Sequence, residues 1–179
     1  MKYLLILFLF TLCFSACKKD KSSIDRLPPI TQEGKNTFGC LINGKLYVPK
    51  GFKQNQSNFS MVIDPTFQNG HFSINTFNTL LKEELIIASN DIGAIGIYRV
   101  EERSNNVFVD YINSETNCSY SPSTMCLING PCYIDGFIQI SKYDLINGLF
   151  SGTFEFKIYD PNTSCDTIFV TEGRFDKKL

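Results

Sequence analysis

Two pairs of adjacent glutamates, Glu83-Glu84 and Glu101-Glu102, suggest acid–base chemistry. Glycosidases, for example, use two carboxylates that flank the bond they cleave. Adjacent residues of a β-strand point to opposite faces of the sheet, so neither pair converges on one site by itself. A hydrolase of this kind requires two of the Asp or Glu residues to meet in one cleft. We keep a carboxylate-based hydrolase as a third hypothesis and assign no catalytic residue.

His71 is the only histidine of the chain. It falls on the polar face of an expected strand, together with Ser73 and Asn75. A histidine-based catalytic triad and a zinc site both need partners at converging positions. One histidine excludes a multi-histidine metal site, and we interpret His71 as a surface residue.

Residues 160–166 carry oxygen donors at alternate positions: Asp160, Asn162, Ser164 and Asp166. A calcium loop uses such donors, but it requires a glycine where this chain has Cys165 and a bidentate glutamate where it has Thr171. The spacing therefore favours a polar hairpin turn. We expect neither a metal ion nor another cofactor.

Five cysteines follow residue 36: Cys40, Cys118, Cys126, Cys132 and Cys165. We expect a disulfide between Cys126 and Cys132, because it would close a short loop with Asn129-Gly130 at its tip. A bond between Cys118 and Cys132 is the rival pairing. The odd number leaves at least one thiol unpaired or intermolecular. No C-x-x-C motif occurs, so a redox or zinc function is not favoured.

Cys17 has the most specific surroundings of any cysteine. An apolar run, Leu4 to Phe14, is too short to span a membrane and has the length of a signal-peptide core. It ends in Phe14-Ser15-Ala16-Cys17, which resembles a bacterial lipobox with Phe in place of the usual first Leu. The resemblance implies cleavage between Ala16 and Cys17 and acylation of Cys17. The alternative is an ordinary signal peptide that is cut after Ala16 and leaves Cys17 unmodified.

The expected organisation has three parts. Residues 1–16 form the signal peptide, residues 17–36 form the lipidated cysteine with a flexible tether, and residues 37–179 form one β-domain. Lys18 follows the acylated residue, whereas an Asp there would suggest retention at the inner membrane. We therefore expect anchoring in the outer membrane of a bacterial cell envelope, with the leaflet left open.

The composition fits a single exported globular domain. Of 179 residues, 43% are hydrophobic, and the net charge is −1, so the chain lacks the basic surface of a nucleic-acid-binding protein. We expect no nucleic acid among the partners. The expected partners are the membrane, through the lipid, and an unknown protein or small molecule.

Alternating hydrophobicity predicts the fold. From Gly148 to Tyr159, apolar side chains occupy every second position, which indicates a long, half-buried strand. Residues 132–141 and 168–175 alternate in the same way, with a bulge expected at Gly173, and Asn43-Gly44 is typical of a hairpin turn. Residues 78–85 are ambiguous between a short helix and a loop. The sequence predicts an all-β fold, either an antiparallel β-sandwich or a flattened barrel, with a C-terminal meander of long strands.

Three short motifs suggest a family. Residues 38–45 (FGCLINGK) open the body, and residues 151–156 (SGTFEF) and 172–176 (EGRFD) close it. Together they resemble a family of uncharacterised Bacteroidota lipoproteins. The resemblance covers both ends of the mature domain but not the middle, about 54–129. It implies a secreted, lipid-anchored β-domain and supplies no catalytic residues.

The first functional hypothesis is therefore a lipid-anchored envelope lipoprotein that acts as a non-enzymatic binding or accessory module. The second is a lipocalin-like carrier of a small apolar ligand. It requires four side chains of the C-terminal meander to line a cavity and not a filled core: Phe150, Phe154, Phe156 and Ile158. The sequence names neither the ligand nor the partner.

Overall fold

The computed structural model describes residues 26–101, 107–121, 133–161 and 165–179. One set of strands comprises β1 (Thr37–Ile42), β2 (Lys45–Tyr47), β6 (Gly96–Glu101), β9 (Tyr133–Asp144), β10 (Leu149–Tyr159) and β11 (Ile168–Lys178). A second set comprises β3 (Phe59–Asp64), β4 (His71–Asn78), β5 (Glu83–Ser89), β7 (Val107–Asn113) and β8 (Cys118–Tyr120).

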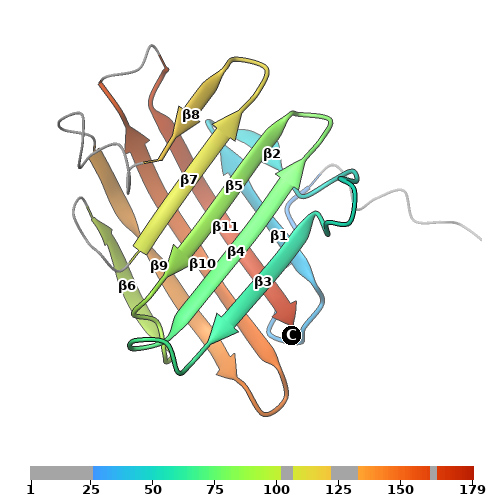
Figure 1. The fold of residues 1–179 in the computed structure, drawn as a ribbon, viewed down its shortest axis with the longest axis vertical. Coiled ribbons are helices and arrows are strands. Elements are labelled where there is room, and N and C mark those ends of the chain that lie inside the picture. The colour runs from blue at the N-terminus through green and yellow to red at the C-terminus, as the bar shows by residue number, and fades with distance from the viewer. Residues whose placement is uncertain (1–25, 102–106, 122–132, 162–164) are drawn as a thin grey trace, which may run out of the picture.

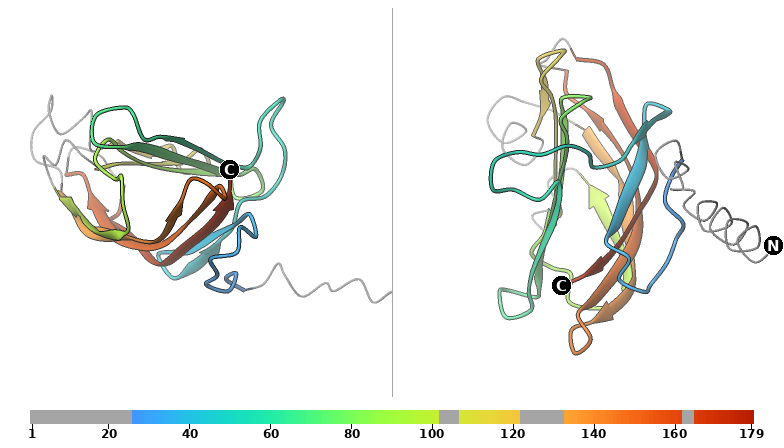
Figure 2. Two further views of the ribbon diagram at one scale, coloured as in Figure 1. Left: turned by 90° about the horizontal axis from the view of Figure 1, so that it is seen from below. Right: turned by 90° about the vertical axis from the view of Figure 1, so that its right-hand side faces the viewer.

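These strands form two antiparallel sheets that pack face to face (Figures 1 and 2). The first sheet has the order β2-β1-β11-β10-β9-β6, and the second has the order β3-β4-β5-β7-β8. The described residues form no helix. The predicted all-β fold is confirmed as a sandwich-like arrangement, and the barrel alternative is wrong because the two sheets do not join into one closed sheet.

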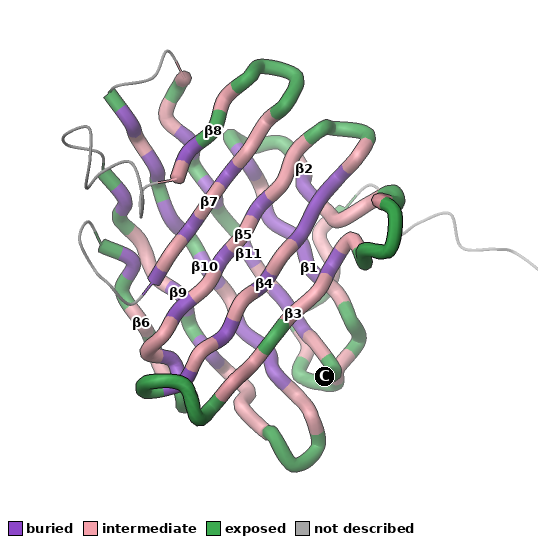
Figure 3. Tube along the Cα trace, in the orientation of Figure 1, coloured by how far each residue is buried: buried purple, intermediate pink, exposed green. Residues whose placement is uncertain are grey.

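The C-terminal meander is the centre of the first sheet. β10 pairs with β9 on one side and with β11 on the other. Alternate residues of these strands are buried, as the purple segments of Figure 3 show. The register of β10 and β11 shifts by one residue next to Glu172, which has a φ of 53°. This bulge lies beside the expected Gly173 and returns Phe175 to the buried face.

Two turns account for the conformation of the first hairpin and of residues 78–85. Asn43 and Gly44 have φ angles of 50° and 74°, so the hairpin of β1 and β2 has the positive φ values that a type I′ turn needs. Asn78 ends β4, and its side-chain Oδ1 accepts hydrogen bonds from the N–H groups of Leu80 and Leu81. This Asn-capped turn leads into β5, so the helix considered for residues 78–85 does not form.

Phenylalanine rings fill the space between the sheets. The ring of Phe150 lies 5.6 Å from that of Phe72 in the second sheet and 5.5 Å from that of Phe175. Phe154 stacks at 5.4 Å on Phe38 and at 5.8 Å on Phe156. Such ring pairs stabilise a core beyond the area they bury. The four side chains that the carrier hypothesis assigns to a cavity are therefore packed in the core, and all four are buried.

The N-terminal segment, which we define as residues 26–36, was expected to belong to a flexible tether. In the structure it lies against the outer face of the first sheet. The expected tether residues before Arg26 lie outside the described residues. Periodicity misses this segment because its contacts come from strands far away in the chain.

One buried carboxylate holds the segment in place. Asp176 follows the core residue Phe175 on β11, so it points outward, and it is 1% exposed. It accepts hydrogen bonds from five groups: the hydroxyls of Thr31 (2.6 Å) and Ser151 (2.7 Å) and the N–H groups of Glu33 (3.1 Å), Gly34 (2.8 Å) and Lys35 (3.1 Å). We call these residues the Asp176 cluster. Burial alone would raise the pKa of Asp176, but these hydrogen bonds outweigh it and hold the pKa at about 2.

Candidate functional site: a pocket at the open edge of the sandwich

One disulfide in the described part of the chain differs from the rival pairing considered for Cys118. Cys118 on β8 bonds to Cys165, which precedes β11, with the two Cα atoms 5.8 Å apart. The rival pairing of Cys118 with Cys132 is therefore wrong. Cys126 and Cys132 lie outside the described residues, as do Ala16 and Cys17. The bond joins the two sheets at one end of the sandwich, across a separation of 47 residues that gave no local signal.

Cys40 is a free thiol in the described part of the chain. It lies on β1 with no exposed surface, and burial raises its pKa far above the ordinary value. A thiol that stays protonated is a poor nucleophile and a poor metal ligand. We therefore interpret Cys40 as a core residue.

The paired glutamates do separate onto opposite faces. Glu83 accepts hydrogen bonds from the Tyr111 hydroxyl (2.8 Å) and the Asn113 amide (3.2 Å), whereas Glu84 forms an ion pair with Lys53. Glu101 forms an ion pair with Arg99, with 3.5 Å between Oε1 and Nη1, and Glu102 is outside the described residues.

Glu83 also lines a polar pocket at the end of the sandwich that carries the disulfide. The pocket has a volume of about 430 Å³, and Asp166 lines it as well. The Tyr120 hydroxyl donates to the backbone carbonyl of Asp166 there. Glu83 on β5 and Asp166 in the loop before β11 thus line one pocket, which is the arrangement that the hydrolase hypothesis looks for.

No metal site is found among the described residues, where no group of three or more histidine, cysteine or acidic side chains lies close enough to hold an ion. The Nδ1 atom of His71 lies 2.7 Å from the Asn90 side-chain oxygen, and its ring packs edge-on against Phe67. In the segment considered as a calcium loop, Cys165 is part of the disulfide and Asp160 is buried. Asn162 and Ser164 lie outside the described residues.

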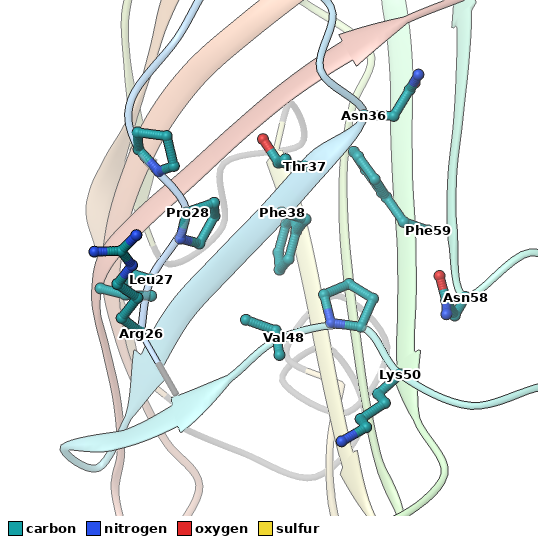
Figure 4. Close-up of a pocket in the computed structure, with 12 residues that line it drawn as sticks. Arg26, Leu27, Pro28, Asn36, Thr37, Phe38, Val48, Lys50, Asn58 and Phe59 are labelled. Atoms are coloured by element: carbon teal, nitrogen blue, oxygen red, sulfur yellow. The ribbon is translucent and has the colours of Figure 1, made fainter. Parts of the chain in front are cut away.

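A larger pocket lies at the open edge of the sandwich, and we call it the edge pocket (Figure 4). It has a volume of about 470 Å³. Four separate segments line it: Arg26, Leu27, Pro28 and Pro29; Asn36, Thr37 and Phe38; Val48, Pro49 and Lys50; and Asn58 and Phe59. Figure 4 shows the first segment on one side of β1, and Lys50 and Asn58 on the other.

The edge pocket exists because β2 is short. β2 ends at Tyr47, and the chain then crosses from the first sheet to the second. The N–H of Lys50 donates to the Phe77 carbonyl (3.1 Å), and the Lys50 carbonyl accepts from the N–H of Thr79 (3.0 Å). The beginning of β1 is therefore left without a neighbour from β2.

The outer wall of the edge pocket rests directly on the backbone of β1. Gly39 lies between the core residues Phe38 and Cys40 and so points outward. A Cβ atom on Gly39 would lie 2.7 Å from Cδ of Pro28 and 3.3 Å from Cδ2 of Leu27, so only glycine allows this approach. Arg174 on β11 adds a hydrogen bond of 3.4 Å to the Pro28 carbonyl.

The charges at the edge pocket have one sign. Arg26 and Lys50 line it, no acidic side chain does, and neither cation forms an ion pair within the described part of the chain. Lys177 lies close to the floor, with its Nζ 4.6 Å from the Phe59 ring centroid and 3.4 Å from the Phe59 carbonyl oxygen. Burial lowers the pKa of Lys177. The site therefore combines an apolar interior with a positive rim whose two cations pair with no described acidic residue.

Sequence reasoning did not identify the edge pocket. One signal was available, because Pro49 follows a return strand of only three residues and cannot donate a ladder hydrogen bond. The opposite wall, at Asn58 and Phe59, comes from the second sheet and depends on how the sheets pack.

The chain matches no protein-family model, no curated protein and no solved structure. Among the described residues there is no helix long and apolar enough to span a membrane.

Proposed function

We propose that this protein is an envelope lipoprotein, anchored through lipid on Cys17, whose β-domain is a non-enzymatic binding module with the edge pocket as its binding site. The observation that carries the binding role is the edge pocket itself, which is mostly apolar and has two cations on its rim that form no ion pair with a described residue. Binding pockets commonly combine an apolar lining with a few polar groups that fix orientation.

The anchoring part of the proposal is supported by sequence. Small residues precede Cys17 at the end of an apolar run, and the motifs at residues 38–45 and 172–176 resemble Bacteroidota lipoproteins. Lys18 favours the outer membrane. The two motifs belong to β1 and β11, which pair with one another.

The edge pocket is a better ligand site than the interior of the sandwich. A lipocalin-like carrier needs space between the sheets, and Phe150 and Phe154 occupy that space. A small apolar ligand remains the alternative occupant, but at the edge pocket.

A second candidate function is hydrolysis at the polar pocket that Glu83 and Asp166 share. It predicts activity on a panel of nitrophenyl glycosides and esters that both Glu83→Gln and Asp166→Asn abolish. Turnover in both variants equal to that of the parent protein, or no turnover by the parent protein, argues against it.

Fatty-acid labelling tests the anchor. The parent chain should incorporate labelled palmitate and sediment with membranes, and Cys17→Ala should lose both properties. Retained label in Cys17→Ala would refute acylation at this residue.

Native mass spectrometry tests the binding role. The chain from Lys18 onward, exported without lipid and purified from the periplasm, should carry extra mass that is lost on denaturation. A clean mass for this chain, together with no partner cross-linked to residues of the edge pocket in cells, would refute the binding role.

A further inference from the structure

β1 has one closed edge and one partly open edge. On the closed edge, β11 pairs with β1 along its length, from Thr37 to Ile42. On the other edge, β2 pairs only with residues 40–42. No described strand covers Thr37–Gly39 on this second edge, and the edge pocket lies beside these residues.

The backbone groups of Phe38 point toward this open edge. The N–H of Asn43 donates to the Phe169 carbonyl on β11 (2.8 Å). Because successive residues of a strand direct their backbone groups to opposite sides, those of Ile42, Cys40 and Phe38 point away from β11.

Pro49 cannot extend the pairing of β2 along this edge. If the register of Cys40 with Tyr47 continued by two residues, Pro49 would stand opposite Phe38. Proline has no N–H to donate. None of the hydrogen bonds of the described residues closes this edge at Phe38. Backbone N–H and C=O groups are obligatory hydrogen-bonding groups, so a bound strand that paired with them would gain affinity.

We propose that the edge pocket binds an extended, acidic segment of a partner protein, which adds to the first sheet as a strand beside Thr37–Gly39. This inference rests on the proposed function, because it names the class of partner that the binding module takes. Strand addition to an exposed sheet edge is a general mode of peptide recognition, in which the main chain supplies affinity and side-chain pockets supply specificity.

The pocket walls define the chemistry of the bound segment. An apolar side chain of the segment enters between Phe38, Val48 and Phe59. The neighbouring side chains of a strand point the other way, toward the rim. Arg26 and Lys50 therefore favour acidic residues at alternate positions of the segment.

A defined peptide tests this proposal. The probe is a capped heptapeptide in which Asp or Glu alternates with Val, added to the mature chain carrying Cys17→Ala. We expect the amide signals of Thr37, Phe38 and Gly39 to shift in NMR spectra and exchange of the Phe38 amide to slow at least about tenfold at saturation. Three control peptides carry Lys in place of the acids, N-methyl groups on the backbone facing β1, or Ser in place of Val.

Matched variants test whether the positive charges of Arg26 and Lys50 contribute to peptide affinity. Arg26→Glu combined with Lys50→Glu should weaken binding of the acidic peptide by at least about tenfold, because two attractive contacts become repulsive. Lys82→Glu, in an exposed turn where Lys82 pairs with Glu115, is the control and should leave the affinity unchanged.

The other occupants give different results. Equal binding of the N-methylated peptide would overturn strand addition. Shifts of the same amides by sodium laurate, but not by the peptide, would assign the edge pocket to an amphiphilic lipid and would leave the proposed binding role intact. Protection of Phe38 that grows with protein concentration in the absence of peptide would assign the edge to a second copy of the chain. No response to the peptide overturns the inference, and native mass spectrometry then decides the proposed function separately.

Discussion

The N-terminal segment contacts the first sheet in two contrasting regions. In the Asp176 cluster, a buried carboxylate accepts five hydrogen bonds, so every one of the donors around it has a partner. At the edge pocket, the same segment packs by apolar contact on Gly39, beside a stretch of β1 that pairs with β11 on one edge and with no described strand on the other. One region therefore holds the segment against the first sheet, whereas the other has an edge of β1 that no described strand covers and is the place where we propose that a partner binds.

The largest effect is expected in the Asp176 cluster. Asp176→Ala removes the acceptor for three backbone N–H groups and two hydroxyls, and it should lower the free energy of unfolding by about 3–5 kcal/mol. Urea denaturation measures this loss. Asp144, which accepts hydrogen bonds from Asn147 in an exposed turn, is the matched control, and Asp144→Ala should cost clearly less. Similar losses in both variants would contradict the structural role of Asp176.

Acid should remove the contribution of the Asp176 cluster to the free energy of unfolding. The pKa of Asp176 is lowered from 3.8 to about 2, so its contribution is complete at a pH above the unfolded-state value and is lost as the pH falls through about 2. The loss should reach about 2 kcal/mol between pH 5 and pH 1.5. Denaturation curves of the parent chain and of Asp176→Asn, measured across this range, isolate the contribution. If both chains lose stability in parallel, then Asp176 does not cause the acid sensitivity.

Short-range patterns were sufficient to predict much of the fold. Alternation along residues 148–159 predicted β10, Asn43-Gly44 predicted the first hairpin, and the interruption near Gly173 predicted the bulge that returns Phe175 to the core. Each of these features depends on residues that are close together in the chain. The choice between sandwich and barrel depends on how strands far apart close or leave open the sheet edges, and the sequence left it undecided.

Features that depend on distant partners were not predicted. Residues 26–36 show no hydrophobic periodicity that would predict their position. They are held by hydrogen bonds to Asp176, which is more than 140 residues away in the chain. Cys118 finds Cys165 because β8 and the start of β11 meet at one end of the sandwich. The edge pocket needs walls from four segments, and only Pro49 gave a local sign of it.

Gly39 connects the two regions and should give an intermediate effect. Gly39→Ala places a Cβ atom 2.7 Å from Pro28, so it should lift residues 27–29 from β1 and cost about 1–2 kcal/mol. The Asp176 cluster should persist, and the Phe38 amide should exchange faster. Gly96→Ala is the control, since its Cβ would meet Tyr98 at an ordinary 3.4 Å. If hydrogen exchange is unchanged at Phe38 but faster at Gly34 and Lys35, then Gly39 supports the Asp176 cluster and not the wall of the edge pocket.

The smallest effect on stability is expected at the rim of the edge pocket. Lys50 forms no ion pair with any described residue, so Lys50→Glu should change the free energy of unfolding by less than about 0.5 kcal/mol. Lys53 in the same loop pairs with Glu84 and lies 4.8 Å from the Phe77 ring centroid, so Lys53→Glu should cost about 1 kcal/mol or more. Thermal and urea denaturation of both variants measure the contrast. If Lys50→Glu lowers the free energy of unfolding as much as Lys53→Glu does, then Lys50 stabilises the fold. The contrast between the stabilising Asp176 cluster and the edge pocket would then not hold for the charged residues of the pocket.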